Sequence, residues 1–467
     1  MAIDTNVLVL GGGPGGYAAA FAATDLGLQV ALVDDAQNPG GVCLYRGCIP
    51  SKTLLHVARL LREAEEAADY GISFPRPVID LARLRAHKEA VVDKLTGGLG
   101  QLARQRRITY VQGRGRFLGR NSLAVARDGG AEEIRFEHAI IATGSLPRSL
   151  DVLQGFGDVV WDSTAALDLK EVPKRLLVVG GGYIGVELAS VYLALGSELT
   201  LVEVTPGLLP GADPDLVRPL LQRLKGQAQL RFETSVLRLA VEGGGLRATL
   251  RGRDGRDEEI VVDRVLQSVG RAPRTAGIGL EALGLAPDPQ GFLPVDAQRR
   301  TALPHIYAIG DVAGQPMLAH KASHEGRVAA EAIAGRPSAF DPAAIPAVVF
   351  TDPEIAWTGL GEAEAEARGI DVEVGRFPWA ASGRAASMGR GDGLTKIVAE
   401  RATGRVLGVG ICGPGAGELI AEGTLAVEMG ALAEDLARTI HPHPTLSETV
   451  MEAAEGILGH ATHYYGR

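Results

Sequence analysis

The chain is poor in cysteine, in aromatic side chains and in long apolar runs. Three cysteines in 467 residues cannot form the disulfide framework of a small secreted protein. We find no run of about 20 apolar residues that could cross a bilayer and no signal peptide before the first predicted strand. The net charge of -9 gives no basic surface for nucleic acid. We therefore expect a cytoplasmic enzyme with no membrane or nucleic-acid partner.

Glycine, by contrast, is abundant. A chain of this length needs more than one hydrophobic core, so several domains are expected. The apolar content of 46% and the charged content of 22% are those of an ordinary globular protein. Many of the 62 glycines lie in turns between a predicted strand and a predicted helix, a placement typical of nucleotide-binding folds.

Two of the three cysteines, Cys43 and Cys48, lie five residues apart between Gly41 and Lys52. A bond between them would close too short a loop to stabilise the fold, so the pair favours redox chemistry. Cys48 precedes Pro50, which suits the first turn of a helix, where free amides and the helix dipole lower the pKa of a thiol. The alternatives are two inert cysteines or half of a metal site, but no further metal ligands follow at short spacing, so we predict no metal.

The N-terminal segment has the pattern of a dinucleotide-binding site. An apolar run over 7–10 precedes Gly11-x-Gly13-x-x-Gly16, a predicted helix follows over 17–26, and a second apolar run ends at Asp34. This glycine spacing permits a tight turn and close approach of a pyrophosphate to the helix N-terminus. The Asp34 carboxylate is placed to accept hydrogen bonds from ribose hydroxyls.

The same pattern returns in the middle of the chain. An apolar run over 176–179 precedes Gly180-x-Gly182-x-x-Gly185, and the next run ends at Glu203. In both copies the acidic residue stands 23 positions after the first glycine, so the sequence predicts two complete dinucleotide sites. Glu203 would repel a 2'-phosphate, which favours NAD over NADP.

Other segments fit the same α/β organisation. We predict helices over 51–70, 81–104 and 318–334, and a change to a mixed domain of strands and helices from about residue 343. Asp311 follows a short predicted strand and either binds a ribityl hydroxyl or caps the next helix. Cys412 has apolar neighbours in sequence and is expected to be an inert core thiol.

The C-terminal segment contains a candidate general base. His443 precedes Glu448 by five residues in a stretch rich in proline and histidine. A carboxylate on one ring nitrogen orients an imidazole and raises its basicity. The alternative is that Thr445 and Glu448 form a capping box for a helix reaching Leu458.

Taken together, these motifs resemble the pyridine nucleotide–disulfide oxidoreductases over essentially the whole chain. The segments that carry the resemblance are the two glycine fingerprints, the Cys43–Lys52 stretch, Ala142-Thr143-Gly144, Gly310-Asp311, and His443-Pro444-Thr445 with Glu448. The chain is similar to those members that oxidise protein-bound dihydrolipoyl groups with NAD+. The resemblance implies two Rossmann-like domains, for FAD and NAD, and a C-terminal mixed α+β dimerisation domain.

The resemblance also implies residue roles. Cys43 would exchange with substrate and Cys48 would face the flavin, while His443 and Glu448 would act on the pair of the other subunit of a homodimer. Lys52 would lie near the flavin and pair with Glu187. The implied cofactor-binding residues are, for FAD, Gly11, Gly13, Pro14, Gly15, Asp34, Lys52, Gly115, Thr143, Gly144, Gly310 and Asp311, and, for NAD, Gly180, Gly182, Tyr183, Ile184, Gly185, Glu187, Glu203 and Gly270.

We predict domain boundaries at 1–147 for FAD, 148–276 for NAD, 277–342 for a segment completing the FAD site, and 343–467 for the dimer interface. A lipoyl-bearing protein of a 2-oxo-acid dehydrogenase complex is the implied partner. The alternatives are a related NAD(P)H-dependent reductase of a small disulfide such as glutathione disulfide, and a non-catalytic scaffold role.

Overall fold

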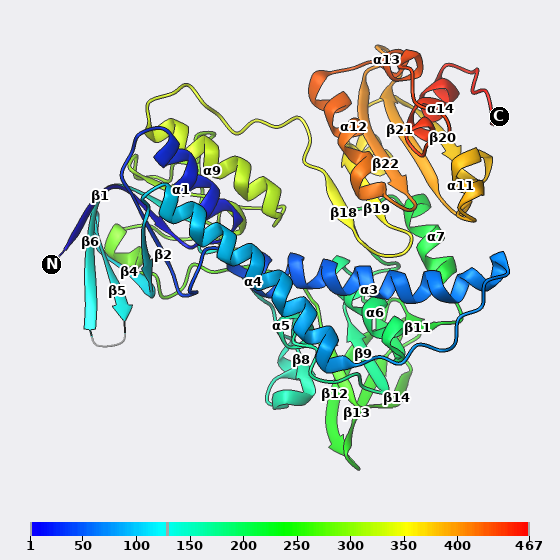
Figure 1. Cartoon of the computed structure of the whole chain (residues 1–467), viewed down its shortest axis with the longest axis horizontal. Coiled ribbons are helices and arrows are strands. Elements are labelled where there is room, and N and C mark those ends of the chain that lie inside the picture. The colour runs from blue at the N-terminus through cyan, green and yellow to red at the C-terminus, as the bar shows by residue number, and fades with distance from the viewer. Residues whose placement is uncertain (1, 128–129, 466–467) are drawn as a thin grey trace.

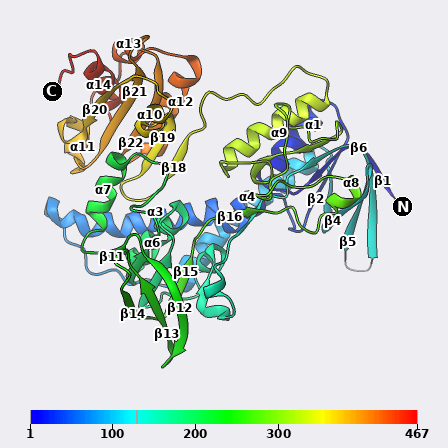
Figure 2. The ribbon, with the colours of Figure 1, turned by 180° about the vertical axis from the view of Figure 1, so that it is seen from behind.

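Two parallel sheets and one antiparallel sheet organise the computed structural model, which describes residues 2–127 and 130–465. Figure 1 shows the N-terminal sheet on the left, the second sheet below the long helix α3, and the C-terminal sheet at the upper right. The view from behind in Figure 2 shows the same three lobes. None of the helices among the described residues is long and apolar enough to span a membrane.

The first lobe is built on a parallel sheet of order β3-β2-β1-β6-β17. The apolar runs of β1 and β2 are almost wholly buried, as expected for parallel strands that are covered on both faces. At its N-terminal end the long strand β6 pairs with β5, which in turn pairs with β4, and these pairs form an antiparallel extension of the sheet. The bounds are β1 (Ile3–Leu10), α1 (Pro14–Asp25), β2 (Val30–Asp34), β3 (Thr109–Gln112), β4 (Arg114–Gly119), β5 (Ser122–Arg127), β6 (Gly130–Ile141) and β17 (Ile306–Ala308).

The second lobe repeats this plan. Its parallel sheet has the order β11-β10-β9-β15-β8, and a separate antiparallel sheet of β12, β13 and β14 takes the place of the extension. The bounds are β8 (Val160–Trp161), α5 (Ser163–Leu167), β9 (Arg175–Val179), α6 (Tyr183–Leu195), β10 (Glu198–Val202), α7 (Pro214–Leu224), β11 (Ala228–Arg231), β12 (Ser235–Glu242), β13 (Gly245–Arg251), β14 (Asp257–Val262) and β15 (Arg264–Gln267).

Connections between these lobes run in both directions. A small antiparallel pair, β7 with β16, lies where the chain passes between the two sheets, and the chain then returns to the first lobe, where β17 pairs with β6 and α9 packs on α1. The bounds are β7 (Ser145–Pro147), β16 (Arg271–Pro273), α8 (Leu280–Leu283) and α9 (Ala319–Ile333), with short 3-10 turns at Asp151–Leu153, Gly157–Val159 and Gly310–Val312.

Helix α3 (Cys48–Glu66) is the element that joins the lobes. It follows the short helix α2 (Gly41–Arg46) and precedes a 3-10 turn (Ala67–Tyr70) and the long helix α4 (Leu81–Gln105). Leu54 and Leu55 of α3 belong to one buried cluster with Val178 and Val186 of the second lobe and Ile355 of the third. The predicted helix over 81–104 is thus confirmed, whereas the one predicted over 51–70 loses its α-helical geometry after Glu66.

The third lobe is an antiparallel sheet of order β18-β19-β22-β21-β20. Helices α12 and α14 pack on it, and Cys412 is wholly buried in β22 as predicted. The bounds are β18 (Ala347–Val349), β19 (Ile355–Gly359), α10 (Glu362–Ala367), β20 (Val372–Pro378), a 3-10 turn (Trp379–Ala381), α11 (Gly383–Ser387), β21 (Leu394–Glu400), β22 (Val406–Cys412), α12 (Ala416–Met429), α13 (Ala433–Arg438) and α14 (Glu448–Ile457).

A buried lysine joins the second and third lobes. Lys396 of β21 is 1% exposed, and its Nζ lies 2.6 Å from Asp213, 2.7 Å from Asp215 and 2.9 Å from Glu362. Three carboxylates this close together could hold a metal ion, but here the ammonium of Lys396 occupies the position between them. A buried charge is stable only when it is paired in this way.

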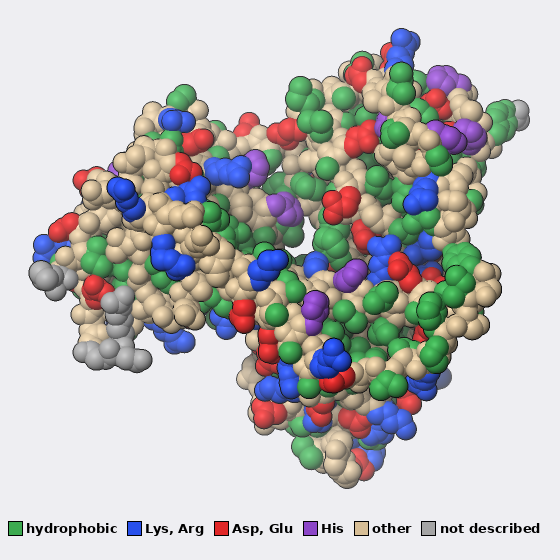
Figure 3. Space-filling model, in the orientation of Figure 1, with side chains coloured by type: hydrophobic (Ala, Val, Ile, Leu, Met, Phe, Trp, Pro, Cys, Tyr) green, Lys and Arg blue, Asp and Glu red, His purple; other side chains and the backbone are tan. Residues whose placement is uncertain are grey.

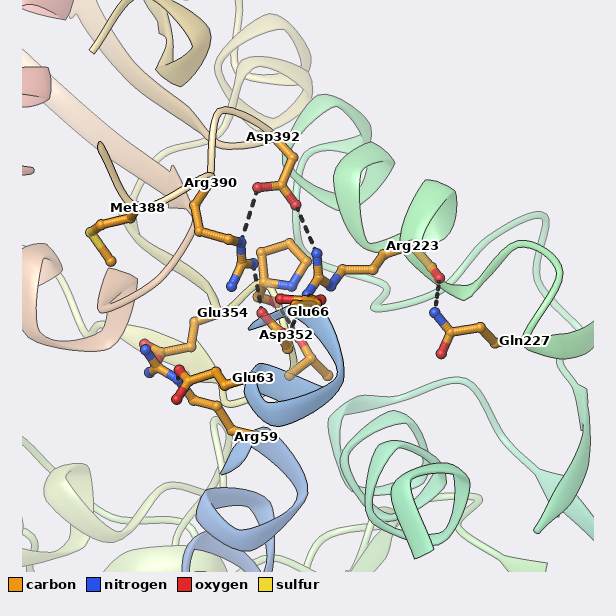
Figure 4. A network of polar contacts seen from close by, with 12 residues as sticks. Arg59, Glu63, Glu66, Arg223, Gln227, Asp352, Glu354, Met388, Arg390 and Asp392 are labelled. Atoms are coloured by element: carbon orange, nitrogen blue, oxygen red, sulfur yellow. Dashed lines mark hydrogen bonds and ion pairs between the residues drawn. The ribbon is translucent and has the colours of Figure 1, made fainter. Parts of the chain in front are cut away.

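A second network lies at the meeting point of all three lobes (Figure 4). Arg223 of α7 contacts Glu66 at the end of α3 and Asp352 in the loop between β18 and β19. Arg390 pairs with Asp352 at 2.6 Å and with Asp392 at 3.3 Å. Away from such networks, acidic and basic side chains are interspersed over the face shown in Figure 3.

Replacing Lys396 with Met is expected to destabilise the fold by about 3–5 kcal/mol, because it removes the buried ammonium from Asp213, Asp215 and Glu362. Arg376 then remains as the cation beside Asp215 and Glu362. Thermal or denaturant unfolding measures this, with the exposed Lys170→Met as the matched control. Burial alone would raise the pKa of Asp215, but hydrogen bonds from Lys396 hold that pKa below its usual value. The Lys396–Asp215 ion pair therefore contributes to the free energy of unfolding at neutral pH, and this contribution is lost as the pH falls through the lowered pKa of Asp215. Equal stability of the two variants would contradict this role for Lys396.

Candidate active site

The first glycine fingerprint forms a close-packed turn at the start of α1. A Cβ on Gly16 would lie 1.8 Å from the Gly11 carbonyl oxygen, so only glycine fits there. Helix α1 begins at Pro14, three residues earlier than predicted, so its N-terminal amides face the turn. The Asp34 carboxylate accepts a hydrogen bond from the Gly12 amide at 2.6 Å and another from Ala36 at 2.9 Å. Each carboxylate oxygen has further lone pairs with which it can bind a ribose hydroxyl.

A cavity of about 400 Å³ opens from this turn and runs between the first and second lobes. It contains both the predicted flavin-binding residues and the redox cysteines, although these come from segments far apart in sequence. The predicted residues that line it are Gly11, Gly13, Pro14, Gly15, Asp34, Cys43, Cys48, Lys52, Gly115, Thr143, Gly144, Tyr183, Ile184, Glu187, Gly310 and Asp311. A cavity that joins a dinucleotide fingerprint to a cysteine pair fits a dinucleotide with a redox-active ring.

The redox segment packs directly on the fingerprint. Gly41 has a φ of +58°, and a Cβ there would lie 2.5 Å from the Gly13 Cα. This contact positions α2, which carries Cys43. Cys48 lies in the first turn of a helix as predicted, but α3 begins at Cys48 itself, three residues before the predicted start at residue 51. The two cysteines are not joined by a disulfide in the structure, and their thiol groups hydrogen bond to each other.

The pKa values of the two thiols are shifted in opposite directions. The hydrogen bond from Cys43 lowers the pKa of Cys48 to about 7, and the charge of Lys52 lowers it further against the effect of burial. The same hydrogen bond, together with burial, raises the pKa of Cys43. A substantial fraction of the reduced pair is therefore ionised at neutral pH, with the negative charge on Cys48, and that thiolate is the nucleophilic form of sulfur.

Lys52 connects the cysteine pair to the second lobe. Its Nζ lies 2.9 Å from Oε2 and 3.1 Å from Oε1 of Glu187 on α6, so the expected pair is present. Glu187 also accepts a hydrogen bond from the Phe350 amide at 3.0 Å, and the Lys52 ammonium lies 4.7 Å above the Phe350 ring. Phe350 belongs to the third lobe, so residues from all three lobes meet at Glu187.

Asp311 lies on the cavity wall in a short 3-10 turn. It accepts a hydrogen bond from Ser145 Oγ, which in turn accepts one from Arg271 Nε at 2.7 Å. Helix α9 starts after Leu318, so the alternative prediction that Asp311 caps this helix is wrong.

The second fingerprint repeats the geometry of the first. A Cβ on Gly185 would lie 2.1 Å from the Gly180 carbonyl oxygen. Glu203 accepts hydrogen bonds from the Gly181 amide at 2.6 Å and the Thr205 amide at 2.8 Å. Gly180, Gly182, Gly185, Glu203 and Gly270 lie outside the cavity that contains the cysteines, whereas Tyr183 and Glu187 of α6 line it.

His443 and Glu448 lie together on the third lobe. His443 Nδ1 is 2.8 Å from Glu448 Oε1, and 72% of the His443 side chain is exposed. Burial alone would raise the pKa of Glu448, but hydrogen bonds from the Thr445 amide and His443 hold that pKa below its usual value. The dyad is not part of the cavity wall of its own chain.

The capping-box alternative is wrong in its register. Helix α14 begins at Glu448 itself, and its N-cap is Ser447 rather than Thr445. Glu448 does accept a hydrogen bond from the Thr445 amide at 2.7 Å. The Thr445 hydroxyl, however, bonds to Pro442 and Ser447 instead of a helix amide. Glu448 therefore holds both the loop and the histidine.

Three residues of the site were not predicted from the sequence: Ser145, Arg271 and Phe350. Ser145 and Arg271 come from the strands β7 and β16 that join the lobes, and Phe350 follows β18. Arg271 directly follows Gly270 in the sequence, so the implied cofactor-binding role of Gly270 was a signal for it. Neither Ser145 nor Phe350 belongs to a motif with a chemical signature.

Comparison with known proteins agrees with this geometry. Residues 5–326 match the family "pyridine nucleotide-disulphide oxidoreductase", and residues 345–454 match the dimerisation domain of the same family. The chain belongs to this family of oxidoreductases, with two Rossmann-like domains and a C-terminal dimerisation domain. The dimerisation domain supports a homodimer.

Several similar proteins carry one name, dihydrolipoyl dehydrogenase. The protein from Vibrio parahaemolyticus is 47% identical over 98% of this chain and 97% of its own length. The protein from Haemophilus influenzae is 48% identical over 98% and 96%. The protein from Thermus scotoductus is 46% identical over 99% of both chains.

Solved structures show the same fold. LpdA from Mycobacterium tuberculosis is 29% identical, covers 97% of this chain and 99% of its own, and has a TM-score of 0.89. The HOCl-induced flavoprotein disulfide reductase RclA from Escherichia coli, as its Cu(II) complex, is 28% identical with the same coverage and a TM-score of 0.86.

The acidity of the cysteine pair predicts its reactivity. In the reduced protein, alkylation of the pair by iodoacetamide is expected to rise with pH around a midpoint of about 7, below the value of about 8.5 for a free thiol. Lys52→Met should move the midpoint upward, because the ammonium stabilises the thiolate, and Lys52→Arg should keep it. Peptide mass spectrometry follows the reaction, with the buried Cys412 as an internal control. A midpoint unaffected by Lys52→Met would contradict this electrostatic role.

Proposed function

We propose that this chain acts as a dihydrolipoyl dehydrogenase, which oxidises protein-bound dihydrolipoyl groups to lipoyl groups with NAD+ through the Cys43–Cys48 pair and FAD. The observation that carries the proposal is the cavity in which the cysteine pair meets the first fingerprint and, through Lys52 and Glu187, the second lobe. The relatives of that name, which match nearly the whole chain, support the same activity.

The cavity fits FAD by its donors and by its shape. The amides at the start of α1 would hold the pyrophosphate, Asp34 would hold the adenosine ribose, and Asp311 would hold the ribityl chain. The second fingerprint, with Glu203, would hold NAD in the same way. Bound FAD would supply the two-electron chemistry that links the cysteine pair to NAD+.

The cysteine pair would perform the exchange with substrate in two steps. In the first step, a dihydrolipoyl thiolate attacks Cys43 of the oxidised pair, and the disulfide breaks with Cys48 leaving as a thiolate. In the second step, the other thiol of the same dihydrolipoyl group, as a thiolate, attacks the first substrate sulfur, which is bonded to Cys43. The bond between that sulfur and Cys43 breaks, and lipoyl disulfide is released. Cys43 takes up the proton that the second substrate thiol gave up, and the proton of the first thiol passes to a base. The lowered pKa of Cys48 favours its departure in the first step.

We infer that His443 is the base that takes the substrate proton, and that it acts on the cysteine pair of the partner subunit. The Nδ1 contact with Glu448 orients the ring so that Nε2 is the nitrogen available to substrate. Its place on the dimerisation domain, its exposure, and its position outside the cavity of its own chain all favour a role across the dimer.

We further propose that the natural substrate is the lipoyl-bearing protein of a 2-oxo-acid dehydrogenase complex, and that the enzyme works in the cytoplasm. The alternative, a reductase of glutathione disulfide that uses NADPH, is not favoured, because Glu203 would repel a 2'-phosphate and the relatives carry a different name. A steady-state assay of dihydrolipoamide with NAD+ against glutathione disulfide with NADPH tests this. Turnover of only the second substrate pair would refute the proposal.

Mixed dimers test the shared site. Cys48→Ser and His443→Gln homodimers should each lose dihydrolipoamide oxidation, the second by about 10²–10⁴-fold, as expected for removal of a general base. A dimer with one chain of each kind has one intact site only if His443 acts across the interface, and it should then regain about half of the wild-type rate. Tandem-tagged heterodimers allow the measurement.

The contrary outcome of this experiment is equally defined. If His443 acts on the cysteines of its own chain, neither site of the mixed dimer is intact, and the heterodimer stays inactive. His443→Gln homodimers should still allow NADH to reduce bound flavin, which is followed by absorbance. Loss of that reaction would assign His443 a structural role.

Glu203 is expected to determine the choice of nicotinamide cofactor. Glu203→Arg removes a charge that would repel the 2'-phosphate and adds one that attracts it. The ratio of kcat/KM for NADPH to that for NADH in flavin reduction should therefore rise by at least about tenfold, with Glu203→Gln giving an intermediate ratio. An unchanged ratio would show that the ribose is recognised elsewhere.

A further inference from the structure

A cluster of three buried charges lies behind the Gly310–Asp311 turn of the cavity wall. Glu325 of α9 is wholly buried, and Lys321, one helical turn earlier, is 5% exposed. Arg299 reaches the cluster from the segment before β17. Glu325 Oε1 lies 3.0 Å from Lys321 Nζ and 2.9 Å from Arg299 Nη1. The proposed reaction has given none of these three residues a role.

The second oxygen of Glu325 holds the turn itself. Oε2 accepts a hydrogen bond from the Gly310 amide at 2.6 Å, and the φ of Gly310, +73°, is one that glycine adopts without strain. Lys321 Nζ also donates to the Gly314 carbonyl at 3.1 Å. The buried cluster therefore fixes the chain on both sides of Asp311.

Arg299 has a backbone conformation that its role in the cluster explains. Its φ of +67° lies in the left-handed region, which is unfavourable for a residue with a Cβ. Such a conformation persists only where the surrounding contacts impose it. Here the guanidinium pairs with Glu325 and lies 4.9 Å from the centre of the Phe340 ring. The fold thus maintains this cation in spite of its backbone, and the buried carboxylate requires it.

Helix α9 connects the cluster to the first fingerprint. It packs along α1 (Figure 1), and the Ser323 hydroxyl donates to the Pro14 carbonyl at 3.2 Å. A Cβ on Gly326 would lie 2.6 Å from the Gly15 carbonyl oxygen. These contacts prevent α9 from sliding along the start of α1. Glu325, which stands between Ser323 and Gly326 in sequence, therefore holds the turn at a fixed distance from the fingerprint.

We propose that Glu325 is a positioning residue for FAD: through the Gly310 amide it fixes the direction in which Asp311 faces the ribityl chain. The inference rests on the proposed function, in which Asp311 binds that chain. Asp311 Oδ2 accepts a hydrogen bond from Ser145 Oγ, and none of the described residues donates to Oδ1, so Oδ1 is available to a ribityl hydroxyl. Glu325 does not line the cavity and acts only through the turn.

The test measures the binding of FAD and of ADP to the full-length chain freed of flavin, by isothermal titration calorimetry. Glu325→Gln offers one carbonyl oxygen to three donors. The two cations take it, so the Gly310 amide loses its acceptor. The Kd of FAD should rise about tenfold, as expected for the loss of one hydrogen bond, whereas the Kd of ADP, which has no ribityl chain, should stay the same. Glu331→Gln, on the same helix but bonded to Ser338, is the matched control and should change neither Kd.

A double-mutant cycle separates positioning from a general loss of structure. If Glu325 acts through Asp311, Glu325→Gln should raise the Kd of FAD by less than about twofold in a protein that already carries Asp311→Asn. Fully additive effects would overturn the inference, as would an equal loss of ADP binding or a Kd for FAD that neither single substitution changes.

A second variant keeps the test valid if Glu325→Gln alone does not fold. Lys321→Met combined with Glu325→Gln removes one cation together with the anion, so the net charge of the cluster stays the same, and the same results are expected. Neither titration depends on turnover. The expected coupling in a chain that does not oxidise dihydrolipoamide would therefore refute only the proposed function.

Discussion

The ion pair between Lys52 and Glu187 is the contact on which the rest of the site depends. Glu187 is 3% exposed, and a carboxylate so deeply buried is stable only with a cation and further donors. Lys52 supplies the cation one helical turn after Cys48, and the Phe350 amide supplies another hydrogen bond. Because these three residues come from three lobes, satisfying one buried charge fixes the distance between the cysteine pair and the second fingerprint.

The two dinucleotide sites follow from the same local physics and differ in what packs on them. Both have a glycine that touches the first carbonyl of the fingerprint and an acidic side chain 2.6 Å from an amide of the turn. In the first copy, Gly41 rests on Gly13 and brings the cysteine segment over the turn. In the second copy, a Cβ on Gly182 would meet no atom within 4 Å. The first site is thereby built around a redox pair, and the second is left accessible to a cofactor that must enter and leave.

What the sequence could predict was local in origin. The glycine spacing, the acidic residue at the end of the next strand, and the helical first turn near Cys48 are each determined within about 25 residues, and the structure has them, although the helix begins three residues earlier than predicted. The contact of Phe350 with Glu187 spans 163 residues and that of Ser145 with Asp311 spans 166, and neither residue type carries a chemical signature. The capping box failed for a different reason: the Thr445 hydroxyl donates to the Pro442 carbonyl instead of accepting from a helix amide, and the helix begins only at Glu448.

The cysteine pair and the histidine dyad lie on different lobes, and this separation favours the proposed sharing of the site between two copies of the chain. The cysteine pair lies in a cavity between the first two lobes, where its shared proton and the nearby ammonium stabilise one thiolate. The His443–Glu448 dyad lies on the third lobe and exposes its ring. A base inside the cavity would place a further titrating group beside Lys52 and Cys48 and would change the acidity that makes Cys48 a leaving group. In the proposed reaction, a base supplied from the surface of a second copy would keep the two acidities independent until substrate lies between them.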